Sequence, residues 1–250
     1  MVRKKTTLTE PAATKTLADR SGVKAAQFGE AQVDNPSSVI ARVSDVDMSD
    51  VAAYISAQDP AFARLITHVG PCTIAASGDG SIFESLAYSV VSQQLSVKAA
   101  DTIGSRLVEL VGSPLTAEAV ASVEVDQLRS VGLSGAKTKT LQELANAVLS
   151  GVIDLQGLLD LPNEVVHQEL TKLWGIGRWT AEMTMIFNMG RLDVWPVGDL
   201  AVRRGWRMIH RMAESPSAEE LESLADLLRP YRSVVAWYCW RATDTKSIEW

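Results

Sequence analysis

In the segment LWGIGRWTAEMTMIF, from Leu173 to Phe187, two glycines flank one isoleucine. Apolar residues with helical spacing precede and follow these glycines. Trp179, Met183 and Ile186 recur at i, i+4 and i+7, which is the period of one helix face. Glycine permits positive φ and close approach of a second backbone. The segment therefore predicts a tight corner between two helices. Ile176 is its expected plug into the core, and the helix that follows opens with amides suited to an anion.

Short helices with clear boundary signals are predicted along most of the chain after Asp47. The predicted boundaries are capping boxes at Ser81–Glu84 and Ser217–Glu220, N-caps at Ser96 and Asn163, a break at Gly132-Leu133-Ser134, and a stop at Pro230. Alternation of apolar and polar residues never persists, so strands are not expected. The sequence predicts an all-α protein.

The N-terminal residues 1–45 are rich in Ala, Thr, Ser and Lys and lack a sustained apolar period. This composition predicts a mostly disordered tail ahead of a helical domain over residues 46–250. The longest apolar run, Val234 to Trp240, is far too short to span a membrane, and no secretory signal is expected. The two cysteines show no metal-binding spacing, which excludes a sequence-evident zinc ribbon or four-cysteine iron–sulfur cluster.

The net charge of −6 argues against nucleic acid as a partner, but the charges are unevenly distributed. Between Lys172 and Arg211 the chain has seven Lys/Arg and three acids. Between Glu214 and Leu228 it has five acids and no base. A locally basic surface is enough to bind phosphates, because only the contacting patch must be positive. A solvated helix face that happens to carry arginines is the alternative.

A second marked segment, DVWPVGDLAVRRGW, runs from Asp193 to Trp206. Pro196 and Gly198 predict a turn, and Asp199 stands where it can cap the next helix. A carboxylate held at that position suits the stabilisation of an adjacent cation, such as an oxocarbenium-like sugar. A plain N-cap, worth roughly 1 kcal/mol, is the alternative interpretation.

Together these segments resemble the helix–hairpin–helix DNA glycosylase superfamily, in which a hairpin of the form LxGIGxxTA precedes a Gly/Pro-rich loop and an aspartate. Here Asp199 follows Gly177 by 22 residues. Within that superfamily the chain looks most like the 3-methyladenine DNA glycosylase II group, from about Asp59 to Trp240. The segments that carry this likeness, in order, are DPAFARLI, GPCTI, FESLAYSVVSQQLSVKAA, VGLSGAKTKTLQELANAVLSG, LWGIGRWTAEM and PYRSVVAWYCW.

The resemblance implies a role for each matching residue. Asp199 matches the catalytic aspartate, and the base pocket is expected from Trp179, Trp240 and Met183. Trp179 falls where lyase members carry a Schiff-base lysine, so this enzyme is expected to use water and to leave an abasic site without nicking the strand. DNA contacts are expected at Gly175, Ile176, Gly177, Arg178, Gln94, Ser134 and Lys137, with Gln94 filling the gap left in the duplex.

No cofactor is expected to be required. The resemblance implies only a Na⁺ or K⁺ ion, held by the backbone carbonyls of Thr171, Leu173 and Ile176 when DNA is bound. Two residues depart from the family pattern: Trp174 stands where many members have proline, and Met183 replaces an aromatic of some relatives.

The chain leaves little room before residue 81 for the N-terminal β lobe that some members carry. We therefore expect a two-lobed helical bundle, with a helix–hairpin–helix motif and a Gly/Pro-rich loop that carries the aspartate. The expected lobes are residues 81–190, and residues 46–80 with 191–250, with a cleft between them. Trp206 and Trp237 lie in apolar runs and are expected in the core.

The implied function is that of a DNA-3-methyladenine glycosylase II. Such an enzyme flips alkylated purines out of duplex DNA and hydrolyses their N-glycosidic bond. The expected partner is double-stranded DNA with alkylated bases. The protein is expected to be a monomer and to have no membrane partner. It would act in the cytoplasm or nucleoid of a bacterium, or in the nucleus of a eukaryote. Two alternatives stay open: a non-catalytic helix–hairpin–helix DNA-binding module, in which Asp199 would serve only as a cap, and a glycosylase for another damaged base.

Overall fold

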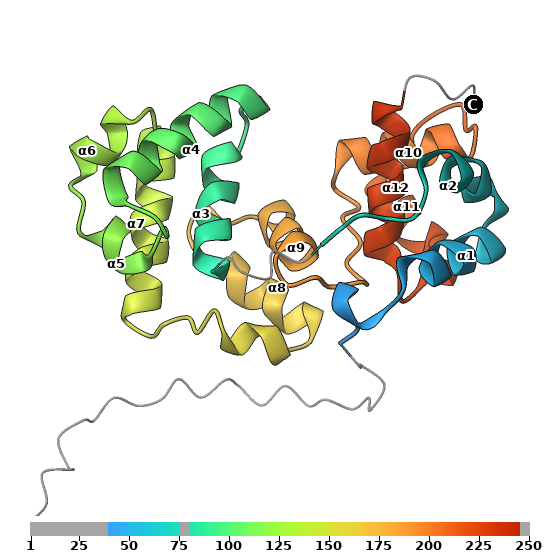
Figure 1. Ribbon diagram of the computed structural model, residues 1–250, viewed down its shortest axis with the longest axis horizontal. Coiled ribbons are helices and arrows are strands. Elements are labelled where there is room, and N and C mark those ends of the chain that lie inside the picture. Colours follow the sequence, from blue (N-terminus) through green and yellow to red (C-terminus); the bar gives the residue numbers. More distant parts are fainter. Residues whose placement is uncertain (1–39, 76–80, 246–250) are drawn as a thin grey trace, which may run out of the picture. The chain divides into compact units, whose positions relative to one another are not determined.

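The computed structural model describes residues 40–75 and 81–245, and within them every regular element is a helix (Figure 1). The N-terminal part of the expected tail, residues 1–39, lies outside the described residues. The elements are η1 (Val43–Asp45), α1 (Met48–Gln58), η2 (Pro60–Phe62), α2 (Ala63–Val69), α3 (Ile82–Ser92), α4 (Val97–Val111), α5 (Ala117–Ala121), α6 (Val125–Ser130), α7 (Gly135–Leu149), η3 (Gly157–Asp160), α8 (Asn163–Thr171), α9 (Arg178–Phe187), α10 (Leu200–Ile209), α11 (Ala218–Leu224), η4 (Asp226–Leu228) and α12 (Arg232–Asp244). The all-α prediction is confirmed for the described residues, none of whose helices is both long and apolar enough to cross a membrane.

The helices pack in two groups along the chain. In the first group, α3 to α9, helix α3 lies against α4, α7 and α9, and α8 lies against α9. In the second group, α10 crosses α12, α2 packs on α12, and η4 lies against α1 and α11. The segment after α9 therefore carries the chain from one group to the other, and Asp199 lies at its end.

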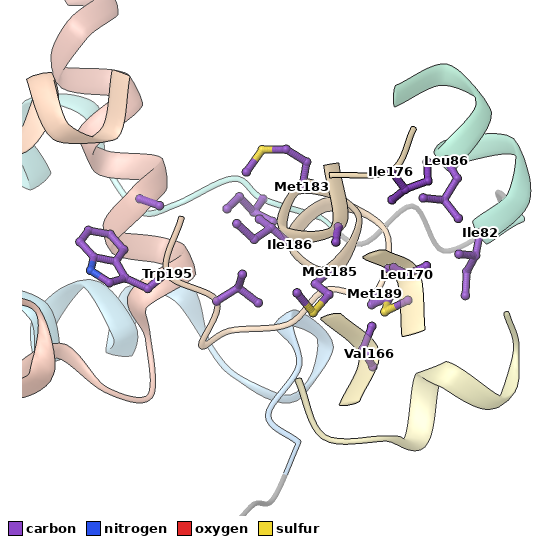
Figure 2. Packing of buried hydrophobic residues seen from close by; sticks show 14 of the residues in the cluster. Ile82, Leu86, Val166, Leu170, Ile176, Met183, Met185, Ile186, Met189 and Trp195 are labelled. Atoms are coloured by element: carbon purple, nitrogen blue, oxygen red, sulfur yellow. The ribbon is translucent and has the colours of Figure 1, made fainter. Parts of the chain in front are cut away.

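Buried apolar side chains from both groups form one cluster. Figure 2 shows its part around α9, where Ile176 points toward Leu86 of α3 and Met185 toward Val166 of α8. Ile176 is 3% exposed, which confirms it as the plug of the corner. Trp206 is buried as expected, but Trp237 is only partly buried, with the Arg241 guanidinium over its ring.

Several helix starts agree with their sequence signals. Ser96 caps α4 by accepting the amide of Ala99, and Ser217 forms a reciprocal capping box with Glu220 at α11. Ser81 also caps α3, but the Glu84 carboxylate accepts the amide of Leu115 instead of completing the predicted box. A capping box needs only local geometry, whereas a distant amide can compete for the same carboxylate.

The cap predicted at Asn163 is wrong. Asn163 is the first helical residue of α8, and Pro162 takes the N-cap position. The Asn163 side-chain amide donates instead to the Asp193 carbonyl, 3.1 Å away. This bond joins α8 to the segment that connects the two groups.

Regular contacts are present before the expected boundary at residue 46. Arg42 forms an antiparallel bridge with Arg191, and the amide of Leu192 donates to the carbonyl of Ala41 at 3.1 Å. Arg42 also donates to the Leu159 carbonyl and pairs with Asp160. Residues 40–45 are therefore held by distant partners that their own composition does not reveal.

Asp193 fixes the connecting segment just before the site. Arg232 binds both carboxylate oxygens of Asp193, through Nε at 2.6 Å and Nη2 at 3.0 Å, and Arg229 adds a bond of 3.1 Å. A bidentate arginine–carboxylate pair sets orientation as well as energy. The start of α12 and the path toward Asp199 are thus tied together.

The crossing of α10 and α12 depends on Gly205. A Cβ added there would overlap the backbone carbonyl of Cys239 and approach its Cα to 2.7 Å. We expect Gly205→Ala to lower the free energy of unfolding by about 1–3 kcal/mol or more, because the backbone cannot move aside cheaply. Gly135→Ala, a matched change at the first residue of α7 where a Cβ meets nothing within 4 Å, is expected to change it by less than about 0.5 kcal/mol. Urea unfolding measures both, and equal effects of the two substitutions would contradict the close crossing.

Candidate active site

Asp199 caps helix α10, as its sequence position predicts. One carboxylate oxygen, Oδ1, accepts the amides of Ala201 and Val202 at 2.8 and 3.0 Å. The Asp199 amide closes the preceding turn by donating to the Pro196 carbonyl at 3.0 Å. The carboxylate is therefore held rigidly by backbone on the α10 side, with Oδ2 left for other partners.

Two tryptophans donate to the same carboxylate. The indole N–H of Trp179 lies 2.8 Å from Oδ2 of Asp199, and that of Trp240 lies 3.4 Å from Oδ1. Trp179 comes from the first turn of α9 and Trp240 from α12. Three elements thus meet at one side chain. The sequence pattern points to Trp179 only as an aromatic surface, and the bond to Asp199 adds an orienting contact that this pattern does not reveal.

The aromatic side chains at the site remain accessible. Trp179 is 44% exposed although its indole N–H is bonded to Asp199. Trp240 is partly buried and stacks on Phe187, with ring centroids 5.6 Å apart and an interplanar angle of 28°. Met183, one turn after Trp179, is buried in the cluster. Phe187 is a site residue that sequence reasoning missed, and its signal is its place one further turn along the same helix face.

The corner between α8 and α9 takes the conformation that its glycines allow. Gly175 has φ +80°, and a Cβ there would overlap the Thr140 hydroxyl and lie 2.8 Å from its methyl carbon. The Ile176 amide donates to the Leu173 carbonyl at 3.1 Å, which closes the turn. Gly177 is the N-cap of α9 and offers no side-chain acceptor to the amides of the first turn. Those amides are therefore free of a side-chain cap and suited to an anion.

The ring of Trp174 contacts Lys139 of α7. The Lys139 ammonium lies 4.2 Å from the centre of its ring, and the ring is 45% exposed. A cation over a tryptophan face is favourable by about 0.5–1 kcal/mol at exposed sites. Trp174 therefore links the corner to α7.

The remaining predicted DNA-contact residues differ in what they bind. Gln94 is exposed in the turn after α3, with the unusual φ of +56° for a residue with a side chain. Ser134 caps α7, and the Lys137 ammonium donates to the Val91 carbonyl at 2.8 Å. Partial burial lowers the pKa of Lys137. These residues bring the starts of α4 and α7 close to the end of α3.

Arg178 has an intramolecular partner. Its Nε donates to the Glu182 carboxylate at 2.8 Å, and Glu182 is buried while the Arg178 side chain is largely exposed. Burial raises the pKa of Glu182, and the nearby guanidinium of Arg178 reduces this effect. A contact between Arg178 and DNA stays a prediction.

A cavity of about 530 Å³ lies beside this ion pair, but it is a poor candidate for the site. Arg178, Glu182, Asp193 and Arg232 line it, and these residues pair with one another. Neither Asp199 nor any of the site tryptophans lines it. Within the described residues, no group of His, Cys, Asp and Glu has the arrangement to hold a metal ion.

The geometry combines three chemical features. A fixed carboxylate lies against an exposed indole, a second indole lies within reach of the same carboxylate, and an uncapped helix start follows the glycine corner. Such a carboxylate can stabilise a developing cation, aromatic faces can stack a planar base, and helix amides can bind a phosphate.

Comparison with known proteins agrees with this combination. The model of the HhH-GPD superfamily base excision DNA repair proteins matches residues 87–230, which include the corner and Asp199. This chain belongs to the HhH-GPD superfamily. The family assignment and the all-helical fold that the sequence resemblance implies are thereby confirmed.

Individual members of the superfamily match most of the described chain. DNA-3-methyladenine glycosylase 1 of Schizosaccharomyces pombe is 35% identical over 164 residues, covering 64% of this chain and 72% of that protein. A structure of the S. pombe 3-methyladenine DNA glycosylase in complex with abasic DNA aligns at 31% identity. Its TM-score is 0.73, over 80% of this chain and all of the other. A DNA-3-methyladenine glycosidase from Bacillus halodurans aligns with TM-score 0.71 and 34% identity, over 79% of this chain and 90% of the other.

The two corner glycines are expected to differ in how strongly their replacement by alanine lowers the stability. Gly175→Ala should lower the free energy of unfolding by about 2–4 kcal/mol, because positive φ is strained for alanine and the Cβ overlaps Thr140. Gly177→Ala should lower it by less than about 1 kcal/mol, because φ is −88° and no atom lies within 4 Å, so that only the poorer N-cap preference of alanine counts. The same loss at both positions in denaturant unfolding would contradict this corner. Adding Thr140→Ala to Gly175→Ala should recover part of the loss.

Proposed function

We propose that this HhH-GPD protein is a DNA glycosylase that removes alkylated purines, of the 3-methyladenine and 7-methylguanine type, from duplex DNA. The observation that carries the proposal is the Asp199 carboxylate, held on one oxygen by two α10 amides and on the other by the indole of Trp179. A DNA-binding module needs no such constellation. Several relatives bear the name DNA-3-methyladenine glycosylase, which supports the same assignment.

The chemistry follows from the charge of the lesion. Alkylation at N3 or N7 makes a purine cationic and a good leaving group. A cation over the face of Trp179 or Trp240 is favourable by about 0.5–2 kcal/mol, the upper value applying where water is excluded. As the glycosidic bond lengthens, positive charge develops on the sugar, and the negative charge of Asp199 stabilises it. Because two helix amides already orient the carboxylate, little reorganisation is needed during the reaction.

Water is the proposed nucleophile, and an abasic site is the proposed product. Trp179 holds the position where lyase members of the superfamily carry their lysine, and an indole cannot form an imine with the sugar. Its N–H instead donates to Asp199. The strand is therefore left intact after base release.

DNA is held by the corner and by the turn after α3. The first amides of α9 bind a phosphate next to the lesion, and Gln94 enters the gap left by the extruded nucleotide. Arg178, Ser134 and Lys137 lie at the helix starts that flank this surface. A structure of the S. pombe relative contains abasic DNA, which supports DNA as the partner here.

A monovalent cation is proposed at the corner only when DNA is bound. The carbonyls of Thr171, Leu173 and Ile176 would hold it, and they lie around the end of α8, where helix carbonyls lack intrahelical partners. Carbonyl oxygens are suitable ligands for such an ion. The Leu173 carbonyl accepts one hydrogen bond, from the Ile176 amide, and a carbonyl oxygen has two lone pairs. When bound, the ion would supply positive charge beside the DNA phosphates. The protein is proposed to act as a monomer, wherever the cell keeps its DNA.

Asp199→Asn tests the catalytic role. Asparagine caps a helix about as well as aspartate, but its NH2 group cannot accept the Trp179 indole, so the free energy of unfolding should fall by about 1–2 kcal/mol. Release of 3-methyladenine and 7-methylguanine from methylated duplex DNA should fall at least about 100-fold. Asp47→Asn, the same substitution at the N-cap of α1, is the matched control and should release base at the wild-type rate. Undiminished release by Asp199→Asn would reduce Asp199 to a plain cap.

A panel of lesions in defined duplexes separates the proposal from its two alternatives. The wild-type protein should release alkylated purines and leave strands that break only after alkali treatment. A non-catalytic module would bind the same duplexes and release nothing. A glycosylase for another damaged base would leave the alkylated purines in place and release a different base from the panel.

Gly177→Ala tests the phosphate grip. The added methyl stands where a phosphate must approach the first amides of α9, and hydrogen bonds to a charged group contribute about 1.5–3 kcal/mol. The affinity for duplex DNA with an abasic site should therefore fall about tenfold to a hundredfold. Fluorescence anisotropy measures this affinity, and wild-type affinity in the variant would place the phosphate elsewhere.

A further inference from the structure

Gln93 connects two elements that lie far apart in the sequence. Its side-chain amide donates to the Gly175 carbonyl at 3.1 Å and to the Thr180 hydroxyl at 3.2 Å. Both N–H groups of the amide can be used by these two acceptors. The C-cap residue of α3 is thereby bonded to the corner and to the first turn of α9.

The residues that follow Gln93 are more exposed than Gln93 itself. Gln94, Leu95 and Ser96 are exposed, whereas Gln93 is partly buried. The turn places Gln94 at φ +56°, a left-handed conformation that is strained for a residue with a Cβ. Within the turn, backbone bonds to Val90 and Ser92 are long, at 3.4 and 3.2 Å. Local hydrogen bonds alone thus hold this turn weakly. The bond from Gln93 to the Gly175 carbonyl attaches the turn to the corner.

The acceptors of Gln93 lie in a rigid part of the corner. Gly175 is packed against Thr140, and Thr180 is buried, with its own carbonyl bonded to the Thr184 hydroxyl. On the other side of the turn, Lys137 binds the Val91 carbonyl. The turn is therefore held from α7 through Val91 and from the corner through Gln93.

We propose that Gln93 is a positioning residue that sets the distance between the gap-filling turn and the phosphate-binding corner. This inference rests on the proposed function, because it takes Gln94 as the gap-filling residue and α9 as the phosphate site. On a duplex, the phosphate beside a lesion and the gap left by the extruded base lie at a fixed separation. The hydrogen bonds of Gln93 fix the corresponding distance in the protein before DNA binds. A displacement of about 1 Å in such a constellation can cost about 100-fold in rate.

Gln93→Glu is the sharpest test of the role. The substitution keeps the shape but replaces the donating amide with an oxygen that faces the Gly175 carbonyl, so the turn and the corner repel each other. The affinity for duplex DNA with an abasic-site analogue, relative to intact duplex, should fall about tenfold, and base release should fall about tenfold to a hundredfold. Gln93→Met, which is neutral and cannot donate, should shift both in the same direction by less.

Gln142→Glu is the matched control. Gln142 also donates its amide to a backbone carbonyl, that of Val123 at 3.4 Å, but it lies on α7 away from the corner contacts. It carries the same charge change, so it should affect stability comparably and leave binding preference and base release at wild-type values. Equal losses in Gln142→Glu and Gln93→Glu would show a general effect of charge or stability and overturn the proposal.

A double-mutant cycle with Gln94 distinguishes positioning from mere support. If Gln93 acts by placing Gln94, then Gln94→Ala should cost at least about threefold less in the Gln93→Glu background than in the wild type. Additive losses would overturn the inference. A wild-type protein that prefers abasic duplex but releases no base would refute the proposed function and still allow the binding cycle to decide on Gln93.

Discussion

The Asp199 carboxylate joins three helices through its two oxygens. Oδ1 is held by the amides of Ala201 and Val202 in α10, Oδ2 accepts the Trp179 indole from α9, and Trp240 of α12 lies within 3.4 Å. Because α9 belongs to one packing group and α10 and α12 to the other, this side chain adds a polar connection between the two groups to the apolar contacts that they share. The group that the proposed chemistry requires is thus also a structural junction.

The rest of the site is arranged around that junction. The bidentate pair between Asp193 and Arg232 fixes the segment that leads to Asp199, and the glycine corner fixes the turn of α9 that carries Trp179. Phe187 supports the ring of Trp240 from the end of the same helix. A carboxylate oriented in this way is ready before substrate arrives, which is what electrostatic stabilisation of a transition state requires.

Local signals in the sequence predict much of this architecture. Contacts between distant segments are the part that the sequence does not reveal. The cap at Asp199, the plug at Ile176 and the helix starts at Ser96 and Ser217 follow from short-range geometry, and the structure confirms them. Glu84, Asn163 and residues 40–45 escape prediction because their partners lie 30 or more residues away. The bonds of Trp179 to Asp199 and of Gln93 to Gly175 are of the same kind, since they span 20 and 82 residues.

The central claim is that Asp199 stabilises positive charge on the sugar, and binding to a charged mimic of that state tests it most directly. Duplex DNA would carry either a cationic pyrrolidine or a neutral tetrahydrofuran in place of the deoxyribose, and the dissociation constants of wild type and Asp199→Asn would be compared. The account predicts that wild type binds the cationic duplex at least about tenfold more tightly than the neutral one, and that Asp199→Asn loses this preference. An equal preference in both proteins would contradict it.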